Sequence, residues 1–470
     1  MNSRKILAFA VGPVLSGLLA IFTIPLLAWF FQPEDIGRNN IYQVCMSFSV
    51  LFFGFGLDQA YVREYHESEK KNELLKTCYI PGFFAIFLFS IGSLPFWKEI
   101  STALFGVQDF SWYLIVVLCG ILTLTERFFS LSLRMQEKGL LFSLCQVFPK
   151  VSIIVGMLLV YKFNFSRDYL KLLLINLASL LTVVAFLAFL TRKNLSEILR
   201  SSLDFDLMRS LLMFGLPLVG AGVAYWGLSA STSIVLRHFS GFKDLGLYSM
   251  AMSLAGVVTI FQTVFTTVWM PTVFKWVSTG ENFERVDSVI RKVVLFVGAA
   301  FCLVGIFSFA IEYVLPKNYH SISSLLVCSV AQPLLYTLSE VTVIGLAIKR
   351  KSSFSLLASL CALFANLLLC LALVPDFGAS GAVAANAAAY AVFLVARTEF
   401  SALFWRAPQR SLIYGVLFFP VGGALISVIF SETLGHISRL YWGACLIFIL
   451  FFFRKDVADS TRYVSRRTMS

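Results

Sequence analysis

Long apolar runs separated by short polar turns dominate this chain. The first run, 6–31, contains 26 residues without a charged side chain. Because the hydrocarbon core of a bilayer is about 30 Å thick, about 20 helical residues cross it, and this run predicts a transmembrane helix with residues to spare. A polar turn at 32–37 follows, and a second apolar run, 41–57, ends at Asp58. The pattern predicts two helices that form a transmembrane hairpin.

The same alternation continues to the C-terminus and predicts an all-α polytopic membrane protein with about fourteen transmembrane helices. The connecting loops are short, so we expect no large soluble domain between the spans. The apolar segments lie at residues 6–31, 39–60, 78–96, 112–133, 140–161, 169–190, 210–236, 245–270, 293–315, 321–347, 354–374, 381–404, 412–430 and 440–453.

Composition agrees with this pattern. Hydrophobic residues make up 58% of the 470 residues and charged residues 14%, against about 45–50% and about 25% in soluble globular proteins. An ordinary soluble protein is therefore excluded. The first run is too long for the apolar region of a secretory signal peptide, so we expect an uncleaved first span.

The basic residues predict the orientation in the membrane. With the N-terminus inside, 27 of the 38 Lys and Arg residues fall in inner loops and tails and eight in outer loops. This excess follows the positive-inside rule and predicts that both termini are cytoplasmic. The net charge of +12 is thus explained by membrane topology, and we expect no nucleic-acid partner. The remaining three cations, Arg127, Lys150 and Lys171, lie within predicted spans.

Short motifs recur about two hundred residues apart and predict two six-helix lobes, which we place at 1–205 and 206–410, with two added helices and a cytoplasmic tail at 411–470. Parallel six-helix repeats are one plan of secondary transporters, with the substrate site between the halves. We therefore expect the two lobes in a pseudo-twofold arrangement around a central cavity. The paired motifs are FAVGP (9–13) with FGLP (214–217), QPEDIG (32–37) with GFKDLG (241–246), and the basic turns at 134–142 and 349–354.

Several of these motifs resemble a known family. The Gly-Pro opening at 12–13, PEDIG at 33–37, GLDQAYVREY at 56–65 and GASGAVAAN at 378–386 are similar to polysaccharide exporters of the multidrug/oligosaccharidyl-lipid/polysaccharide (MOP) superfamily. Within its polysaccharide transport branch, the chain most resembles O-antigen flippases of the Wzx type, from Gly12 to about Phe404.

The resemblance implies a flippase that moves an undecaprenyl-diphosphate-linked oligosaccharide, an O-antigen or capsule/exopolysaccharide repeat unit, across the bacterial inner membrane by alternating access. It implies a role in lipopolysaccharide or related polysaccharide biosynthesis. The implied partners are this lipid-linked glycan, the bilayer, a polysaccharide polymerase and a chain-length regulator.

Cations within the spans are the candidate substrate-binding residues, because the cargo carries an anionic diphosphate. Charges at a helix centre cost about 2.5–3.5 kcal/mol on insertion scales and are kept for function or for pairing. We select Lys150, near the middle of the fifth span, Arg127 in the fourth, and Arg63 at the end of the second. The alternative for Lys150 and Arg127 is a structural pair with Glu126 or Asp58.

Three acids are candidates for ion coupling or for counter-charges: Glu126, Asp58 and Glu340. Proton or sodium coupling is the only accessory chemistry that we consider, and we expect no cofactor. No Cys-x-x-Cys motif, metal cluster, nucleophile or Gly-rich phosphate loop is present, so neither a metal site nor catalytic residues are predicted.

Two other functions remain open. A multidrug or small-solute exporter of the same superfamily would place acids in its cavity for cationic drugs, and the deep cations of this chain argue against it. A membrane polysaccharide polymerase, ligase or glycosyltransferase usually has a large outer loop, whereas the longest one here, 97–111, has only three charged residues. We therefore expect a transporter rather than an enzyme.

Overall fold

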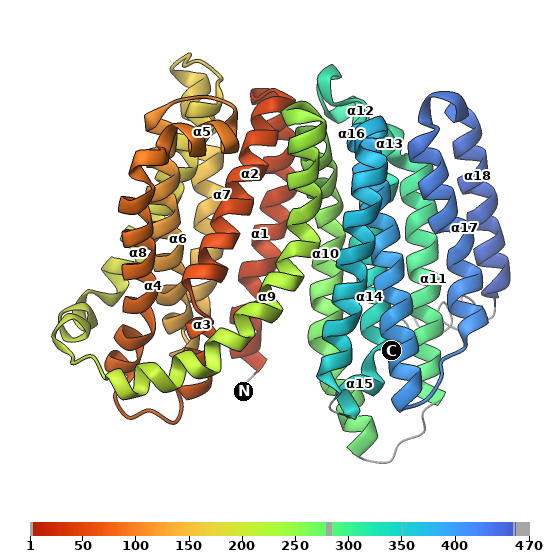
Figure 1. The fold of residues 1–470 in the computed structure, drawn as a ribbon. Helices are drawn as coiled ribbons and strands as arrows, with labels where there is room; N and C mark the ends of the chain where they lie inside the picture. The colour runs from red at the N-terminus through yellow and green to blue at the C-terminus, as the bar shows by residue number, and fades with distance from the viewer. Residues whose placement is uncertain (1–2, 279–283, 350, 455, 457–470) are drawn as a thin grey trace. The chain divides into compact units, whose positions relative to one another are not determined.

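The chain is helical throughout the part that the structure describes. The structure is a computed structural model and describes residues 3–278, 284–349, 351–454 and 456 (Figure 1). In these residues every regular element is an α-helix or a short 3-10 helix. The chain divides into two compact units, Met1–Ser233 and Ile234–Ser470. Both chain ends, which we predict to be cytoplasmic, lie outside the described residues.

Unit 1 is a bundle of long helices with three short helical elements, α3, η1 and α5. Its elements are α1 (Ser3–Phe30), α2 (Pro33–Phe53), α3 (Leu57–Glu64), α4 (Lys71–Ser93), η1 (Leu94–Phe96), α5 (Trp97–Phe105), α6 (Phe110–Met135), α7 (Gly139–Lys162), α8 (Tyr169–Arg200) and most of α9 (Phe205–Phe239).

Unit 2 contains the remaining helices. They are α10 (Gly241–Ser278), α11 (Glu284–Phe307), η2 (Ser308–Ala310), α12 (Ile311–Val314), η3 (Lys317–Tyr319), α13 (Ile322–Ser329), α14 (Ala331–Thr342), α15 (Ile344–Ile348), α16 (Ser352–Phe404), α17 (Arg410–Ile429) and α18 (Ser431–Phe452).

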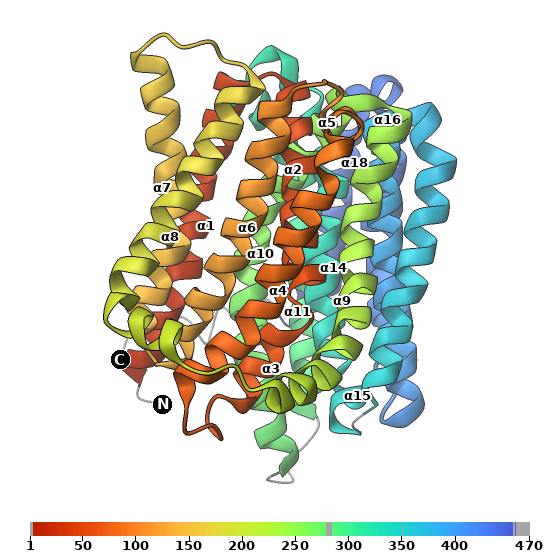
Figure 2. The same ribbon diagram turned by 60° about the vertical axis from the view of Figure 1, so that its left-hand side comes forward.

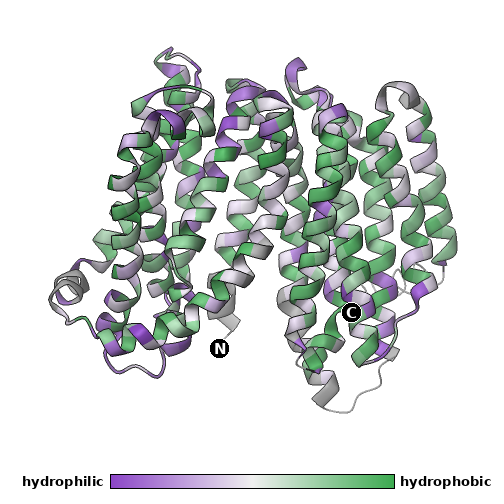
Figure 3. Cartoon of the chain, in the orientation of Figure 1, coloured by the Kyte–Doolittle hydropathy of each residue, from purple (hydrophilic) through white to green (hydrophobic). Residues whose placement is uncertain are grey.

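The prediction of an all-α membrane protein is confirmed, and the fourteen predicted apolar segments lie mainly on helices. Among the described residues ten helices are long and apolar enough to cross a membrane, and the bent pair α2 and α3 makes an eleventh. The long helix α16 contains two of the predicted segments, because Gly378 interrupts it with φ 51° and ψ −127°. Hydrophobic residues line the helix bodies and hydrophilic ones gather toward the helix ends (Figure 3).

The predicted second span is not one straight helix. It bends by 56° between α2 and α3, at Gly54-Phe55-Gly56, where Phe55 and Gly56 have φ of 50° and 67°. Glycine adopts such a left-handed conformation at no steric cost. The bend brings the start of α3 against α9, since a Cβ atom on Gly56 would lie 2.3 Å from the carbonyl oxygen of Gly215.

The helices within each unit pack in a corresponding order. In unit 1, α6 contacts α2, α4 and α8, and in unit 2, α14 contacts α10, α11 and α16. Asp35 lies in the first turn of α2 and Asp244 in the first turn of α10. This correspondence agrees with the predicted six-helix repeat. The lobe limits at 205 and 410 stay a prediction.

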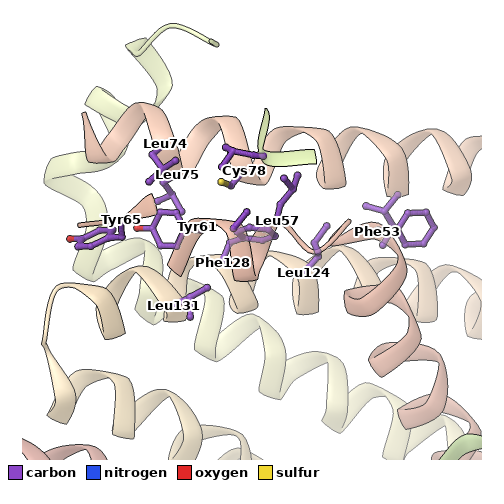
Figure 4. Close-up of a cluster of buried hydrophobic side chains, with 13 residues drawn as sticks. Phe53, Leu57, Tyr61, Tyr65, Leu74, Leu75, Cys78, Leu124, Phe128 and Leu131 are labelled. Carbon is purple, nitrogen blue, oxygen red and sulfur yellow. The ribbon is translucent and has the colours of Figure 1, made fainter. Parts of the chain in front are cut away.

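A core of buried side chains holds α3 in place within unit 1. Leu57, Tyr61, Leu74, Cys78 and Phe128 are at most 1% exposed and form one cluster from α3, α4 and α6 (Figure 4). Burial of each such side chain contributes about 1.5–3 kcal/mol. The cluster fixes the direction of α3 after the bend, which in turn places the charged residues of α3.

Candidate functional site

An ion pair joins two of the predicted site residues in unit 1. Nη2 of Arg127 on α6 lies 2.7 Å, and its Nε 3.2 Å, from Oδ2 of Asp58 on α3. The side chain of Asp58 is 16% exposed and that of Arg127 44% exposed. A guanidinium has five N–H donors. Two of them face Asp58, and the other three remain available to a ligand.

Arg127 and Glu126 both line a cavity of about 490 Å³ between α2, α6 and α7. The walls also present neutral polar groups, from Gln43 and Ser47 on α2, Thr123 and Ser130 on α6, and Gln146 on α7. The described lining of the site therefore combines one cation, one carboxylate, amides and hydroxyls between three helices of unit 1. Such a set can bind an anionic, hydroxyl-rich group or a cation, depending on which charge dominates.

Lys150 is half-buried on α7, one helical turn beyond Gln146, and is not part of the cavity wall. Among the described residues its ammonium group has no hydrogen-bond or ion-pair partner. The sequence left two interpretations open for Lys150, a structural pair with Glu126 or Asp58 and a role in binding. In this structure the pair with Glu126 is not formed.

Arg63 lies one and a half turns after Asp58 on α3 but contacts other groups. Its guanidinium carbon lies 4.4 Å from the centre of the Phe214 ring, and its Nε lies 3.5 Å from a carboxylate oxygen of Glu64. The side chain is 58% exposed. The structure therefore does not bring Arg63 into the cavity that contains Arg127.

The last predicted residue, Glu340, forms a buried ion pair in unit 2. Nη1 of Arg397 lies 2.7 Å from its carboxylate and 2.7 Å from the hydroxyl of Ser339. The side chains of Arg397 and Glu340 are 11% and 9% exposed. The Arg397 guanidinium also lies 4.9 Å from the centre of the Phe393 ring. Glu340 is thus a counter-charge of Arg397 here.

Sequence reasoning missed Arg397 because it was counted with the basic residues of the inner loop that follows, although it falls seven residues before the end of the predicted span 381–404. In the structure it lies within α16, which continues to Phe404. The available signal was its depth in the helix, since seven uncharged or acidic helical residues follow Arg397 before α16 ends at Phe404. In the described part of the chain, no group of three His, Cys, Asp or Glu side chains is placed to hold a metal ion.

Comparison with known proteins identifies the family. Residues 3–277 match the family described as "Polysaccharide biosynthesis protein". The match covers more than half of the chain. No curated protein matches it.

Solved structures show the same fold. The chain is similar to "Lipid II flippase MurJ, inward closed conformation", with a TM-score of 0.64 and 15% identity over 96% of this chain and 99% of that chain. It is also similar to an inward-facing multidrug resistance MATE transporter of the MOP superfamily, with a TM-score of 0.59 and 14% identity over 82% of this chain and 95% of that one. At these identities the similarity concerns the fold alone. The family match, which covers more than half of the chain, shows that the chain belongs to the polysaccharide biosynthesis protein family.

Proposed function

We propose that the chain is a flippase that moves an undecaprenyl-diphosphate-linked oligosaccharide from the cytoplasmic to the periplasmic leaflet of a bacterial inner membrane by alternating access. The cargo would be an O-antigen or a capsule/exopolysaccharide repeat unit. Membership of the polysaccharide biosynthesis family supports a saccharide cargo. The single observation that carries the proposal is the polar cavity in unit 1, in which the Arg127 guanidinium keeps free donors.

Arg127 is suited to recognise a diphosphate. Arginine binds phosphate oxygens with paired, charge-assisted N–H···O bonds. Asp58 occupies one edge of the guanidinium and fixes its orientation, so Asp58 acts as a positioning residue. The neighbouring hydroxyls and amides donate and accept hydrogen bonds, as a sugar adjoining the diphosphate requires.

Lys150 provides a second positive charge close to this cavity. It lacks a protein counter-charge among the described residues, and a half-buried ammonium in an apolar span is costly unless something compensates it. We infer that the diphosphate supplies this compensation while the cargo is bound. Lysine acts as a point charge without a fixed fork, so arginine should partly replace it.

Glu126 is the strongest candidate for proton or sodium coupling. Asp58 and Glu340 are engaged as counter-charges of Arg127 and Arg397, whereas Glu126 lines the cavity without a direct ion pair or hydrogen bond in the described residues. A carboxylate that binds a cation when the cavity is empty and releases it when the diphosphate arrives would couple transport of the cation to transport of the lipid-linked cargo.

Reconstitution of the full chain into proteoliposomes tests the proposal. Undecaprenyl-diphosphate-linked oligosaccharide is placed in the inner leaflet, and its arrival outside is measured with a membrane-impermeant glycosidase. We expect Arg127→Ala and Lys150→Ala to reduce the rate at least tenfold, and Lys150→Arg to retain part of it. Lys162→Ala is the matched control, because this exposed lysine lies in the last turn of the same helix.

Two results would contradict the proposal. The proposed flippase function is wrong if vesicles that contain the wild-type protein move no lipid-linked oligosaccharide. Full transport by the double variant Lys150→Ala, Glu126→Gln would show that Lys150 only neutralises Glu126.

An exporter of cationic solutes is the second candidate function, because the carboxylate of Glu126 lines the same cavity. In that case uptake of a cationic dye into inverted vesicles would depend on Glu126 and be insensitive to Arg127→Ala. The flippase proposal expects the opposite sensitivity.

A further inference from the structure

A second polar cavity, of about 240 Å³, lies within unit 2 and has no role in the function proposed above. Its lining comes from the C-terminal end of α11, the short elements after it, the start of α13, the end of α17 and the start of α18. Because these helix ends close apolar helices long enough to cross a bilayer, we expect them at its boundary. The cavity therefore lies at the level of the lipid headgroups, and the distribution of basic residues assigns it to the periplasmic leaflet.

Among the described residues, one positive and one negative side chain line the cavity, and they do not pair with each other. Arg439 on α18 and Glu312 on α12 both line it. The guanidinium carbon of Arg439 lies 4.7 Å from the centre of the Phe309 ring, a cation–π contact that holds the cation at the wall. Among the described residues neither charged group has an ion-pair partner. A ligand with two opposite charges would compensate both.

Six serine residues complete the polar lining. Three of them donate their hydroxyl proton to a backbone carbonyl at 2.8–3.1 Å and keep their lone pairs free to accept, namely Ser323, Ser324 and Ser427. The other three have no hydrogen-bond partner among the described residues and can both donate and accept, namely Ser308, Ser431 and Ser438. The cavity thus offers donors for an anion and acceptors for an ammonium group.

Exposed apolar and amphipathic side chains adjoin the cavity. Tyr313, next to Glu312, is 84% exposed, and Ile437 and Leu440, on either side of Ser438 and Arg439, are 63% and 76% exposed. Tyrosine is enriched where the membrane meets water. These exposed side chains can contact the acyl chains of a lipid whose headgroup occupies the polar cavity.

We propose that this cavity binds the headgroup of a phosphoethanolamine lipid. The phosphate accepts from Arg439 and from the free serine hydroxyls, and the ammonium donates to Glu312 and to serine lone pairs. The volume holds about eight waters at ~30 Å³ each, and phosphoethanolamine has about as many non-hydrogen atoms. An anionic headgroup would leave Glu312 beside a second negative charge, and a neutral sugar would leave both charges uncompensated.

Native mass spectrometry of the purified full chain tests the proposal. The protein is delipidated, supplied with equal amounts of phosphatidylethanolamine and phosphatidylglycerol, and the retained lipids are counted. We expect wild type to retain one phosphatidylethanolamine selectively. Arg439→Gln and Glu312→Gln should each lower its occupancy at least tenfold, and Arg439→Lys should restore part of it.

Arg454→Gln is the matched control, because Arg454 follows the same helix α18 at its other end and also lies over a phenylalanine ring, at 5.1 Å. It should bind like wild type, and gel filtration of every variant checks folding. Equal retention of both lipids, or retention unchanged by Arg439→Gln and Glu312→Gln, would overturn the proposal. Displacement of the lipid by free oligosaccharide would assign the cavity to a glycan and overturn it too. The measurement needs no transport, so it stands or fails independently of the proposed flippase activity.

Discussion

The contact between Gly56 and Gly215 offers a direct test of how α3 is held. A Cβ atom on Gly56 would lie 2.3 Å from the Gly215 carbonyl oxygen, and one on Gly215 would lie 2.5 Å from the Phe55 carbonyl oxygen. Both neighbours are backbone atoms, which cannot rotate away as a side chain can. Replacing either glycine by alanine must therefore push α3 and α9 apart.

The magnitude follows from two separate terms. Overpacking of a close contact costs about 1–3 kcal/mol, which applies to Gly215→Ala. Gly56 has in addition a φ of 67°, and the left-handed region costs a non-glycine residue about 1–2 kcal/mol. Gly56→Ala should thus cost about 2–5 kcal/mol. At about 2–4 °C per kcal/mol for a unit of this size, Gly215→Ala lowers the apparent melting temperature by about 2–12 °C.

The assay is the fraction of full-length protein that remains monodisperse in size-exclusion chromatography after heating in detergent. Gly220→Ala is the matched control on the same helix, because a Cβ atom there meets no atom within 4 Å. Alanine is favoured over glycine in a helix interior by roughly 0.5–1 kcal/mol, so this variant should be as stable as wild type or slightly more stable. A Gly215→Ala variant as stable as Gly220→Ala would refute the close approach of α3 and α9.

Three further results are expected. Asp58→Asn and Arg127→Gln should each impair transport. In a double-mutant cycle on the free energy of unfolding, the two changes should be coupled by about 1.5–3 kcal/mol, as for a hydrogen bond to a charged group. Additive effects on stability would contradict the ion pair. Glu340→Ala should destabilise by about 3–5 kcal/mol, because it leaves the charge of Arg397 buried and uncompensated, and an unchanged melting temperature would contradict this. A reporter that works only in the cytoplasm should be active when it is fused after Ser470. Activity there of a reporter that works only in the periplasm would contradict the predicted orientation.

The fold was largely predictable from the sequence, because a bilayer leaves few choices. Helices satisfy their own backbone hydrogen bonds in lipid, so each apolar run of sufficient length becomes a helix. Ten of the described helices, or eleven with the bent pair α2 and α3, are long and apolar enough to span a membrane, and Gly378 separates two predicted segments within α16. The charges at the ends of the runs predict the orientation, and the recurrence of Asp35 and Asp244 in the first turns of α2 and α10 made the internal repeat visible.

What only the tertiary structure decided is which charges meet. From the sequence, Arg127 and Lys150 could each pair with Glu126 or Asp58. In the structure Arg127 pairs with Asp58, and Lys150 pairs with none of the described residues. The reason is the bend at Gly54–Gly56, which redirects α3 by 56° and carries Asp58 to the side of α6. Hydropathy depends on the residues of each segment alone. It therefore predicts which segments cross the bilayer as helices, but not how those helices are oriented toward one another. The rotation and bend of each helix depend on contacts between segments far apart in sequence, such as Gly56 with Gly215, and these determine where each charged side chain points.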